Sequence, residues 1–333
     1  MSTKERILKL LEERRGEFVS GEAIADTVCV TRAGVWKAIK NLREEGFKID
    51  AVTNRGYRLN NSFEKIDKEM FETFLKDNDI SAKFIYLDTV DSTNNEALRR
   101  SCETDGNIIV IAEEQTSGKG RRGRAFHSAK YSGLYISILI HTGRLSEIAP
   151  VTAIAAVAAS TAIDKVVFSG RDTTKIKWVN DIYLDEKKVT GILSEAFSSM
   201  EDGGDCKVIV GTGINVIEPE EGFPKEIAQK AGALLKGAEH SGKLRTMLAC
   251  EMTKRFLEIF ENYETECENC LKFYREKSNL IGKYVMINPF SPVKEGEKYA
   301  KAVDIDRDYH LVVEYSNGRR EALSSGEVSV VRY

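Results

Sequence analysis

Nine consecutive residues, 116–124, place three glycines and four cationic side chains in one loop. Glycine lets backbone N–H groups approach a ligand closely, and clustered arginine and lysine bind phosphate or carboxylate through charge-assisted hydrogen bonds. Apolar runs at 108–112 and 134–140 flank the loop, so it joins two expected strands. The segment predicts a mobile anion-binding loop, and a solvated basic turn is the alternative.

The glycines of this loop also match the dinucleotide-binding spacing G-x-G-x-x-G, at Gly118, Gly120 and Gly123. That fingerprint requires a helix to begin at the glycines. The residues that follow, 125–133, are polar, show no helical period and run into the second expected strand. We therefore reject a Rossmann-type dinucleotide site.

The composition sets the broad class of the chain. With 333 residues, 42% of them hydrophobic, it can bury a large core in two or three domains. No apolar run approaches the roughly 18 residues of a membrane span, and no apolar stretch typical of a signal peptide follows the charged residues 4–6. The six cysteines are scattered, as in a reduced protein, and the Cys267–Cys270 spacing lacks a second pair of metal ligands. We expect a cytoplasmic protein that does not enter a membrane.

The first part of the chain, residues 1–62, has the pattern of a winged helix-turn-helix. Apolar residues at helical spacing occur in 4–13 and 31–43, Ser20 and Thr31 stand at N-cap positions, and 47–59 read as a hairpin. Residues 1–60 carry a net charge of +3, which leaves −6 for the rest of a chain whose total is −3. A basic segment on an acidic body suggests a polyanionic partner.

The expected recognition helix carries its basic side chains on the face opposite its apolar one. Such a face fits the major groove of DNA, and cations on the hairpin suit phosphate or minor-groove contacts. A surface helix of ordinary charge is the alternative, although an exposed tryptophan is unusual there. The candidate DNA-binding residues are Arg32, Trp36, Lys37, Lys40, Arg55 and Arg58.

The rest of the chain predicts an α+β protein with two further domains. Residues 63–80 read as a linker and a helix, and 81–278 as a mixed α/β domain with an apolar helix at 148–167. The strands of this domain are expected at 84–87, 108–112, 134–140, 175–179, 189–197 and 207–216. Residues 279–333 predict five short strands that form a small SH3-like β-barrel.

Five short polar segments of the middle domain are expected to converge on one site. Each has a simple structural explanation by itself, as a helix cap, a turn, a surface lysine or a bend. They are Asp91-Ser92-Thr93-Asn94, Gln115 with the glycine-rich loop, Lys177-Trp178-Val179-Asn180-Asp181, Lys188 before Gly191-Ile192-Leu193, and Gly211-Thr212-Gly213-Ile214-Asn215.

Together these motifs resemble the biotin–protein ligases in order and spacing, over nearly the whole chain. The N-terminal winged helix resembles that of the bifunctional members, which also repress the biotin operon. In two places the sequence departs from the usual motif. Lys119 stands where many relatives have arginine, which keeps the charge but loses the planar fork, and Val179 replaces a frequent proline.

The resemblance implies a central domain of the biotin/lipoate ligase fold and a reaction in two steps. Biotin and Mg-ATP would give biotinyl-5′-adenylate, which a lysine of a carboxylase carrier domain then attacks. Arg121 and Lys188 are the candidate catalytic residues, because two anions must be brought together and the crowded transition state stabilised. For the Mg²⁺ ion, Asp181 is the candidate ligand.

The resemblance and the chemistry of the ligands assign two binding sets. Neutral donors and acceptors suit the ureido ring of biotin, and cations and amides suit the nucleotide. The biotin set is Ser92, Thr93, Asn94, Gln115, Lys119, Gly120, Arg121 and Lys188. The ATP and adenylate set is Arg121, Arg122, Lys177, Asn180, Asp181 and Asn215.

The resemblance also implies regulation. If ligand orders residues 116–124 and the ordered loop completes a dimer surface, the adenylate acts as corepressor and the homodimer binds operator DNA. Two other functions remain. An effector-sensing transcription factor without ligase activity does not need the phosphate-handling Lys177 and Asp181, and a lipoate–protein ligase does not need the winged helix.

Overall fold

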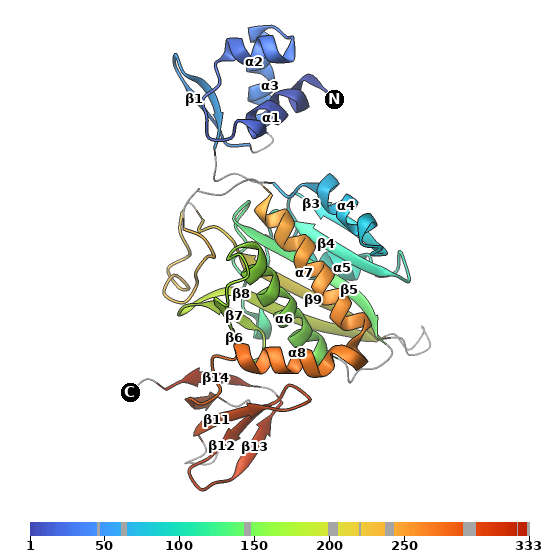
Figure 1. Ribbon diagram of the computed structural model, residues 1–333, viewed down its shortest axis with the longest axis vertical. Coiled ribbons are helices and arrows are strands. Elements are labelled where there is room, and N and C mark those ends of the chain that lie inside the picture. The colour runs from blue at the N-terminus through green and yellow to red at the C-terminus, as the bar shows by residue number, and fades with distance from the viewer. Residues whose placement is uncertain are drawn as a thin grey trace. The chain divides into compact units, whose positions relative to one another are not determined.

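The computed structural model describes residues 1–44, 47–60, 65–142, 148–198, 206–219, 221–236, 243–288, 298–324 and 326–331. The chain divides into two compact units (Figure 1). The first unit contains residues 1–66 and 236–244, and the second contains 67–235 and 245–333.

The first unit contains three helices followed by a two-stranded antiparallel hairpin, as the sequence predicts. Its elements are α1 (Thr3–Glu13), α2 (Gly21–Val28), α3 (Arg32–Glu44), β1 (Ile49–Val52) and β2 (Gly56–Leu59). Both predicted N-caps are present: Ser20 Oγ accepts from Ala23 N at 3.0 Å and Thr31 Oγ1 from Gly34 N at 3.1 Å. The apolar faces of the three helices meet in one small core.

Gly56 is required at the turn of this hairpin. Its φ of +99° suits glycine, and a Cβ there would lie 2.1 Å from the carbonyl oxygen of Val19. The backbone N–H of Val19 and that of Tyr57 each donate to the other's carbonyl at 2.8 Å, so β2 is fixed against the segment before α2. The predicted winged helix-turn-helix is therefore confirmed in fold.

A seven-stranded mixed sheet forms the centre of the second unit. Only β3 and β4 run parallel, and every other neighbouring pair is antiparallel. The strand order is β3-β4-β5-β9-β8-β7-β6. The strands are β3 (Ala82–Leu87), β4 (Asn107–Ala112), β5 (Gly133–Thr142), β6 (Thr174–Lys177), β7 (Asp181–Leu184), β8 (Lys187–Ser198) and β9 (Cys206–Asn215).

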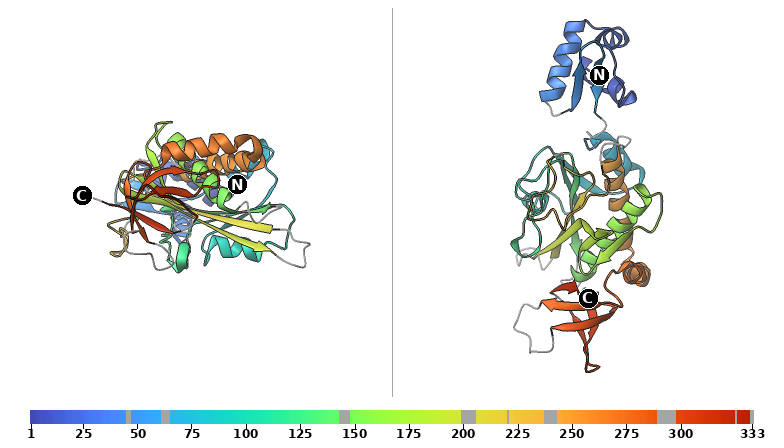
Figure 2. Two further views of the ribbon diagram at one scale, coloured as in Figure 1. Left: turned by 90° about the horizontal axis from the view of Figure 1, so that it is seen from below. Right: turned by 90° about the vertical axis from the view of Figure 1, so that its left-hand side faces the viewer.

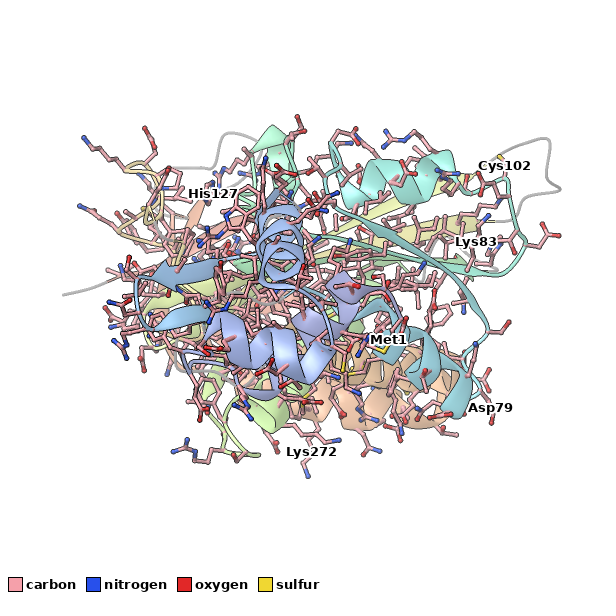
Figure 3. The ribbon with its side chains drawn as sticks, turned by 90° about the horizontal axis from the view of Figure 1, so that it is seen from above. Met1, Asp79, Lys83, Cys102, His127 and Lys272 are labelled. Carbon is pink, nitrogen blue, oxygen red and sulfur yellow. The ribbon has the colours of Figure 1, made fainter. Side chains whose placement is uncertain are left out.

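Helices cover both faces of this sheet (Figure 2). The helices of the second unit are α4 (Lys68–Asp77), α5 (Thr93–Arg99), α6 (Ile148–Val166), α7 (Leu244–Glu261) and α8 (Tyr263–Lys277). The short helix α5 lies on one face, and α6 and α7 lie on the other. Lys83 of β3 forms an ion pair with Glu103, next to Cys102, which ties the turn after α5 to the edge strand (Figure 3). Among the helices described, none has the length and apolar composition of a membrane span.

The sheet differs from the sequence prediction around residue 180. The expected strand at 175–179 ends at Lys177, and the sequence analysis missed β7 altogether. β7 has only four residues and stands between polar turns, so its apolar alternation is too short to detect. As a result, Trp178, Val179 and Asn180 form the turn of a β6–β7 hairpin.

The C-terminal part of the second unit is a five-stranded antiparallel sheet of order β13-β12-β11-β10-β14. All five predicted strands are present, and the arrangement is consistent with a small SH3-like barrel. They are β10 (Tyr284–Asn288), β11 (Tyr299–Ile305), β12 (Leu311–Glu314), β13 (Arg320–Leu323) and β14 (Glu327–Val330).

Candidate functional site

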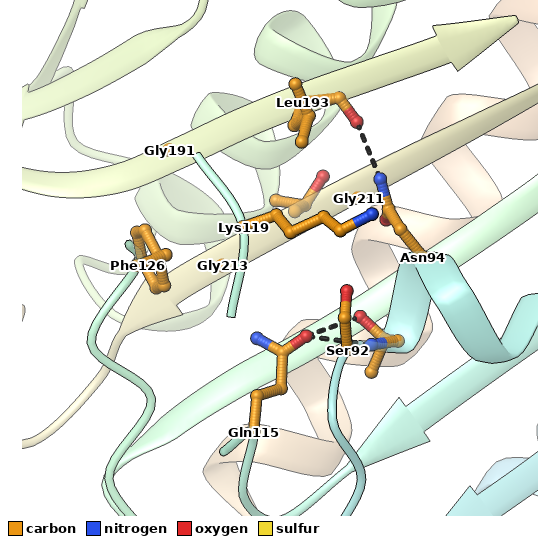
Figure 4. Close-up of a pocket in the computed structure, with 11 residues that line it drawn as sticks. Ser92, Asn94, Gln115, Lys119, Phe126, Gly191, Leu193, Gly211 and Gly213 are labelled. Atoms are coloured by element: carbon orange, nitrogen blue, oxygen red, sulfur yellow. Dashed lines mark hydrogen bonds between the residues drawn. The ribbon is translucent and has the colours of Figure 1, made fainter. Parts of the chain in front are cut away.

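A pocket opens over the middle of the central sheet, on the face that α5 covers (Figure 4). Residues from three of the predicted motifs and from the glycine-rich loop meet there. Its lining consists of Ser92, Thr93, Asn94, Gln115, Lys119, Phe126, Gly191, Leu193, Gly211, Thr212 and Gly213.

Gln115 forms one polar side of the pocket. Its Oε1 accepts hydrogen bonds from Thr93 N (2.8 Å) and Thr93 Oγ1 (3.0 Å), and its Nε2 donates to Ser128 Oγ at 2.8 Å. Ser92 stands at the N-cap position of α5 but makes no capping bond with its side chain, which is only 2% exposed. Its hydroxyl therefore remains available to a ligand in the pocket.

Asn94 joins α5 to three strands of the sheet. Its Nδ2 donates to Glu195 Oε2 at 2.7 Å, and its Oδ1 accepts from the hydroxyl of Ser137 at 2.6 Å. A Cβ on Gly211 would lie 2.1 Å from that same Oδ1, so the amide needs a glycine beneath it. Figure 4 shows the Lys119 ammonium pointing towards Asn94, and this ammonium lies 4.0 Å from Glu195 Oε1.

The floor of the pocket is made of glycine backbone with an aromatic ring against it. Gly191 and Gly213 are partners across β8 and β9. A Cβ on Gly213 would lie 2.4 Å from the Phe126 ring, and one on Gly191 would lie 3.1 Å from the same ring. The Phe126 ring and the glycine backbone together form an apolar wall next to the polar groups of the pocket. A flat ring of a bound ligand could pack against this wall.

A cationic site adjoins the pocket at the β6–β7 turn. Arg121 Nη1 donates to Asn180 Oδ1 at 3.0 Å, and Lys188 Nζ lies 2.6 Å from Asp181 Oδ1. A Cβ on Gly191 would lie 3.2 Å from Lys188 Nζ and 3.1 Å from Phe126, so the ammonium lies at the pocket floor. The glycine-rich loop and β8 thereby bring two cations to consecutive residues, Asn180 at the end of the turn and Asp181 at the start of β7.

The surrounding structure fixes this turn. Asn180 Nδ2 donates to Ile192 O at 2.6 Å, and Tyr274 OH of α8 donates to Val179 O at 2.8 Å. Trp178 Nε1 donates to the carbonyl oxygen of Tyr309, in the turn between β11 and β12, at 2.8 Å. Burial, followed by the nearby charge of Asp181, raises the pKa of Tyr183 to about 12, so its phenol stays neutral at physiological pH.

Three other predicted residues have different surroundings. Lys177 lies over the ring of Tyr183 at 5.7 Å, and Asn215 Nδ2 donates to Gly232 O at 3.0 Å. Asp91 does not line the pocket. The Arg99 guanidinium that donates to Asp91, with smaller help from Asn95, holds the pKa of that carboxyl well below its usual range.

Three residues around the pocket, Phe126, Ser137 and Glu195, belong to none of the predicted motifs, because their contacts join positions far apart in the chain. Phe126 is an apolar residue in a polar stretch, which was a usable signal. Ser137 and Glu195 lie inside strands and carry no local motif.

Asp181 fits the chemistry of a Mg²⁺ ligand, since Mg²⁺ takes one or two carboxylates and completes its shell with water and phosphate. The ammonium of Lys188 at 2.6 Å neutralises that carboxylate in the structure described here. In the part of the chain described, one further group, Asp306, Asp308 and His310, has the spacing of metal ligands. Asp306 Oδ1 accepts from the backbone N–H groups of both Asp308 and His310, as expected of a turn.

The candidate DNA-binding residues belong to the first unit. Trp36 is 60% exposed on α3, with the Lys40 ammonium 5.8 Å from its ring centre. Arg32 pairs with Glu22 at 2.6 Å. Arg55 and Arg58 of the hairpin both lie over the Phe18 ring, at 4.4 and 4.5 Å.

Comparisons with known proteins agree with both units. The biotin/lipoate A/B protein ligase family matches residues 85–215, and an HTH domain matches residues 3–58. The bifunctional ligase/repressor BirA of Bacillus subtilis is 31% identical over 96% of this chain and 96% of its own. The protein of the same name from Escherichia coli is 30% identical over 95% of this chain and 94% of its own.

Among solved structures, the biotin protein ligase of Aquifex aeolicus in complex with biotin and ATP shares the fold. It superposes with a TM-score of 0.59 at 24% identity, over 75% of this chain and 99% of that one.

Proposed function

Because the chain belongs to the family of bifunctional biotin–protein ligases and repressors, we propose that it joins biotin to a carrier protein and represses biotin genes. In the enzymatic reaction, ATP and biotin give biotinyl-5′-AMP, and a carrier lysine then takes the biotinyl group. One observation carries this proposal. Arg121 and Lys188 reach consecutive residues, Asn180 and Asp181, next to a pocket with a glycine floor and a polar wall formed by Thr93 and Gln115.

The pocket suits the ureido ring and thioether of biotin. The buried hydroxyl of Ser92 can donate to or accept from the ureido group, and the Thr93–Gln115 pair supplies a second neutral polar edge. Phe126 and the glycine backbone suit the apolar thioether ring of biotin. Lys119 and Gly120 belong to the loop 116–124, which would close over the bound biotin.

In the first step, a carboxylate oxygen of biotin attacks the α-phosphorus of ATP. The bond from that phosphorus to the oxygen bridging to the β-phosphate breaks, and pyrophosphate leaves. Two anions must approach each other, so the reaction requires fixed positive charge at the meeting point. Arg121 and Lys188 supply this charge, and Asn180 and Asp181 hold the two cations in place beforehand.

The nucleotide would lie along the β6–β7 turn. Lys177 and Arg122 supply charge for the phosphates, and Asn180 and Asn215 supply amides. Asp181 is the residue that would hold Mg²⁺, which supplies charge neutralisation on the phosphates when it is bound.

In the second step, the neutral amine of a carrier lysine attacks the acyl carbon of the adenylate. The bond to the phosphate oxygen breaks, AMP leaves, and the amine loses a proton. Since the nucleophile belongs to the carrier, the chain itself needs none. Its task is to keep water from the mixed anhydride, which the closed loop 116–124 would do.

The first unit supplies the repressor function. The outer face of α3, with Trp36, Lys37 and Lys40, would enter the major groove, and Arg55 and Arg58 would contact the backbone or the minor groove. Adenylate binding would favour a homodimer that places two such helices on two half-sites of the operator. The adenylate then acts as corepressor when carrier protein is scarce.

The enzymatic proposal is tested by incubating the full chain with Mg-ATP, a biotin carboxyl carrier domain and either biotin or lipoate. We expect the carrier lysine to acquire biotin and not lipoate. Transfer of lipoate alone would make the chain a lipoate–protein ligase. Absence of any transfer, with intact binding of biotin, would make it an effector-sensing transcription factor.

The corepressor proposal is tested by footprinting operator DNA with the chain alone, with ATP and with biotinyl-5′-AMP. We expect the adenylate to raise operator affinity by about 10- to 100-fold, which is the usual size of an allosteric coupling. Footprints of equal strength with and without the adenylate would refute the coupling but leave the ligase activity standing.

A further inference from the structure

A buried ion pair lies where the segment between β4 and β5 leaves the sheet, and neither step of the proposed reaction uses it. Arg245 at the start of α7 and Glu113 at the end of β4 are both fully buried, with Arg245 Nη2 2.5 Å from Glu113 Oε2. Such pairs are weak evidence for stability, because well-packed apolar residues often replace them without loss. The contacts of this pair instead suit a role in holding a specific geometry.

The segment from Glu113 to Gly133 connects β4 to β5 and contains the glycine-rich loop; it is called the connection below. Both of its ends contact Arg245. Glu113 directly follows β4 and stands two residues before Gln115. Arg245 Nε also donates to the carbonyl oxygen of Gly133 at 2.7 Å, and Gly133 is the first residue of β5. One guanidinium thus bridges the residue at which the connection leaves the sheet and the residue at which it returns.

Further contacts fix each side of this bridge. Tyr86 OH of β3 donates to Glu113 Oε1 at 2.7 Å, so both carboxylate oxygens are engaged. Thr246, next to Arg245, accepts from Asp67 N at 2.9 Å, which anchors the start of α7. On the loop side, Tyr131 N donates to Glu113 O at 3.3 Å.

We propose that Arg245 is a positioning residue for ligand binding, because it clamps the base of the connection that carries Gln115, Lys119, Arg121 and Phe126. The clamp sets where the loop can close, although Arg245 itself touches no substrate. This inference rests on the proposed ligase function. A planar guanidinium suits the role, since its fork reaches a carboxylate and a carbonyl at once, whereas a lysine makes a point contact.

The test compares Arg245→Lys, Tyr86→Phe and the wild-type chain in biotin transfer. Lysine keeps the charge beside Glu113 and loses the fork, so we expect the KM for biotin to rise about tenfold while kcat stays within about threefold. Tyr86→Phe removes one bond to Glu113 and keeps the ring, so it should shift KM in the same direction by less.

Lys277→Met is the matched control. Lys277 is also a buried cation, paired with Asp164 and Asp172, but it links α8 to α6 away from the loop. We expect it to lower the melting temperature and to leave the KM for biotin unchanged. Limited trypsin digestion supplies a second readout: Arg245→Lys should need about tenfold more biotinyl-5′-AMP than the wild type to protect 116–124, whereas Lys277→Met should be protected at the wild-type concentration.

Two results would overturn the proposal. One is an Arg245→Lys chain that melts lower but keeps the KM and the ligand protection of the wild type. The other is a Lys277→Met chain that shows the same rise in KM, which would reduce the effect to general destabilisation. A wild-type chain without transfer activity would instead count against the proposed function. In that case, ligand protection of 116–124 in the wild type and in Arg245→Lys would still test whether Arg245 positions the loop.

Discussion

Single residues in the pocket have roles that depend on what lies next to them. Ser92 and Asp91 are neighbours in one motif, yet Ser92 faces the pocket and Asp91 binds Arg99 and Asn95 on α5. Likewise, the glycines of β8 and β9 matter because Phe126 and Asn94 occupy the space that a Cβ would need. One motif therefore contains residues that line the pocket and residues that only hold neighbouring elements in place.

The glycine floor leads to a prediction about Gly213→Ala. The added Cβ would lie 2.4 Å from the Phe126 ring, which must move and disturb the apolar wall. We expect the KM for biotin to rise about tenfold, as overpacking commonly costs 1–3 kcal/mol. Gly106→Ala is the control, because its Cβ would meet Thr104 Oγ1 at an ordinary 3.5 Å. Equal KM values for the two variants would refute this role for Gly213.

Asp91→Asn should lower stability in a manner that depends on pH. Arg99 holds the folded-state pKa of Asp91 below its unfolded value of about 3.9, so the charged form contributes stability above that pH and loses it as the pH falls. Because Asp91 and Arg99 are partly exposed, the expected loss in melting temperature near pH 7 is only about 1–3 °C. Melting curves at pH 7, 5 and 3 test this: the difference between the variant and the wild type should be the same at pH 7 and 5 and smaller at pH 3. A difference that is largest at pH 3 would contradict the prediction.

Much of the site could be predicted from the sequence at this scale. Ser92, Thr93, Asn94 and Gln115 do meet in one pocket, since they occupy the ends of neighbouring elements. Phe126, Ser137 and Glu195 were missed, because their contacts join positions tens of residues apart and no spacing encodes them.

At the scale of elements, two connections build the cationic site next to the pocket. The loop 116–124 brings Arg121, and the β6–β7 turn brings Asn180 and Asp181. The loop is closed on itself at its base, where Phe126 N donates to Gly118 O at 2.8 Å and Gly120 N donates to Arg124 O at 2.7 Å. The turn, by contrast, is held from outside by Trp178 and Tyr274.

The loop should change its mobility when ligand binds. Ordering nine residues costs about 9–18 kcal/mol of backbone entropy, so ligand contacts are needed to hold the loop closed. We expect trypsin to cut the free protein at Arg121 or Arg122 and biotinyl-5′-AMP to block the cut. Equal cutting rates with and without the adenylate would remove this role of the loop.

The elements were predictable where their apolar period was long. The helix α6 and the strands β4, β5, β8 and β9 match the expected positions within a few residues. The four-residue β7 was not predictable, because its position depends on pairing with β6 and β8 rather than on its own sequence. Without β7, the hairpin that places Asn180 and Asp181 near Arg121 and Lys188 could not be predicted.

At the scale of the whole molecule, a winged helix-turn-helix unit and a ligase unit occur in one chain. The division between them was predicted near residue 62 and lies at residue 66, with residues 236–244 also assigned to the first unit. The two units give one chain both the means to make the adenylate and the means to report it to DNA.

The central claim is that Arg121 and Lys188 act together at one turn to drive adenylate formation. Biotin-dependent exchange of pyrophosphate into ATP measures that step without the carrier. We predict exchange with biotin for the wild-type chain, and a loss of about 100- to 1,000-fold for either Arg121→Met or Lys188→Met, as expected when one preorganised charge is removed. Exchange at the wild-type rate in either variant would contradict the account.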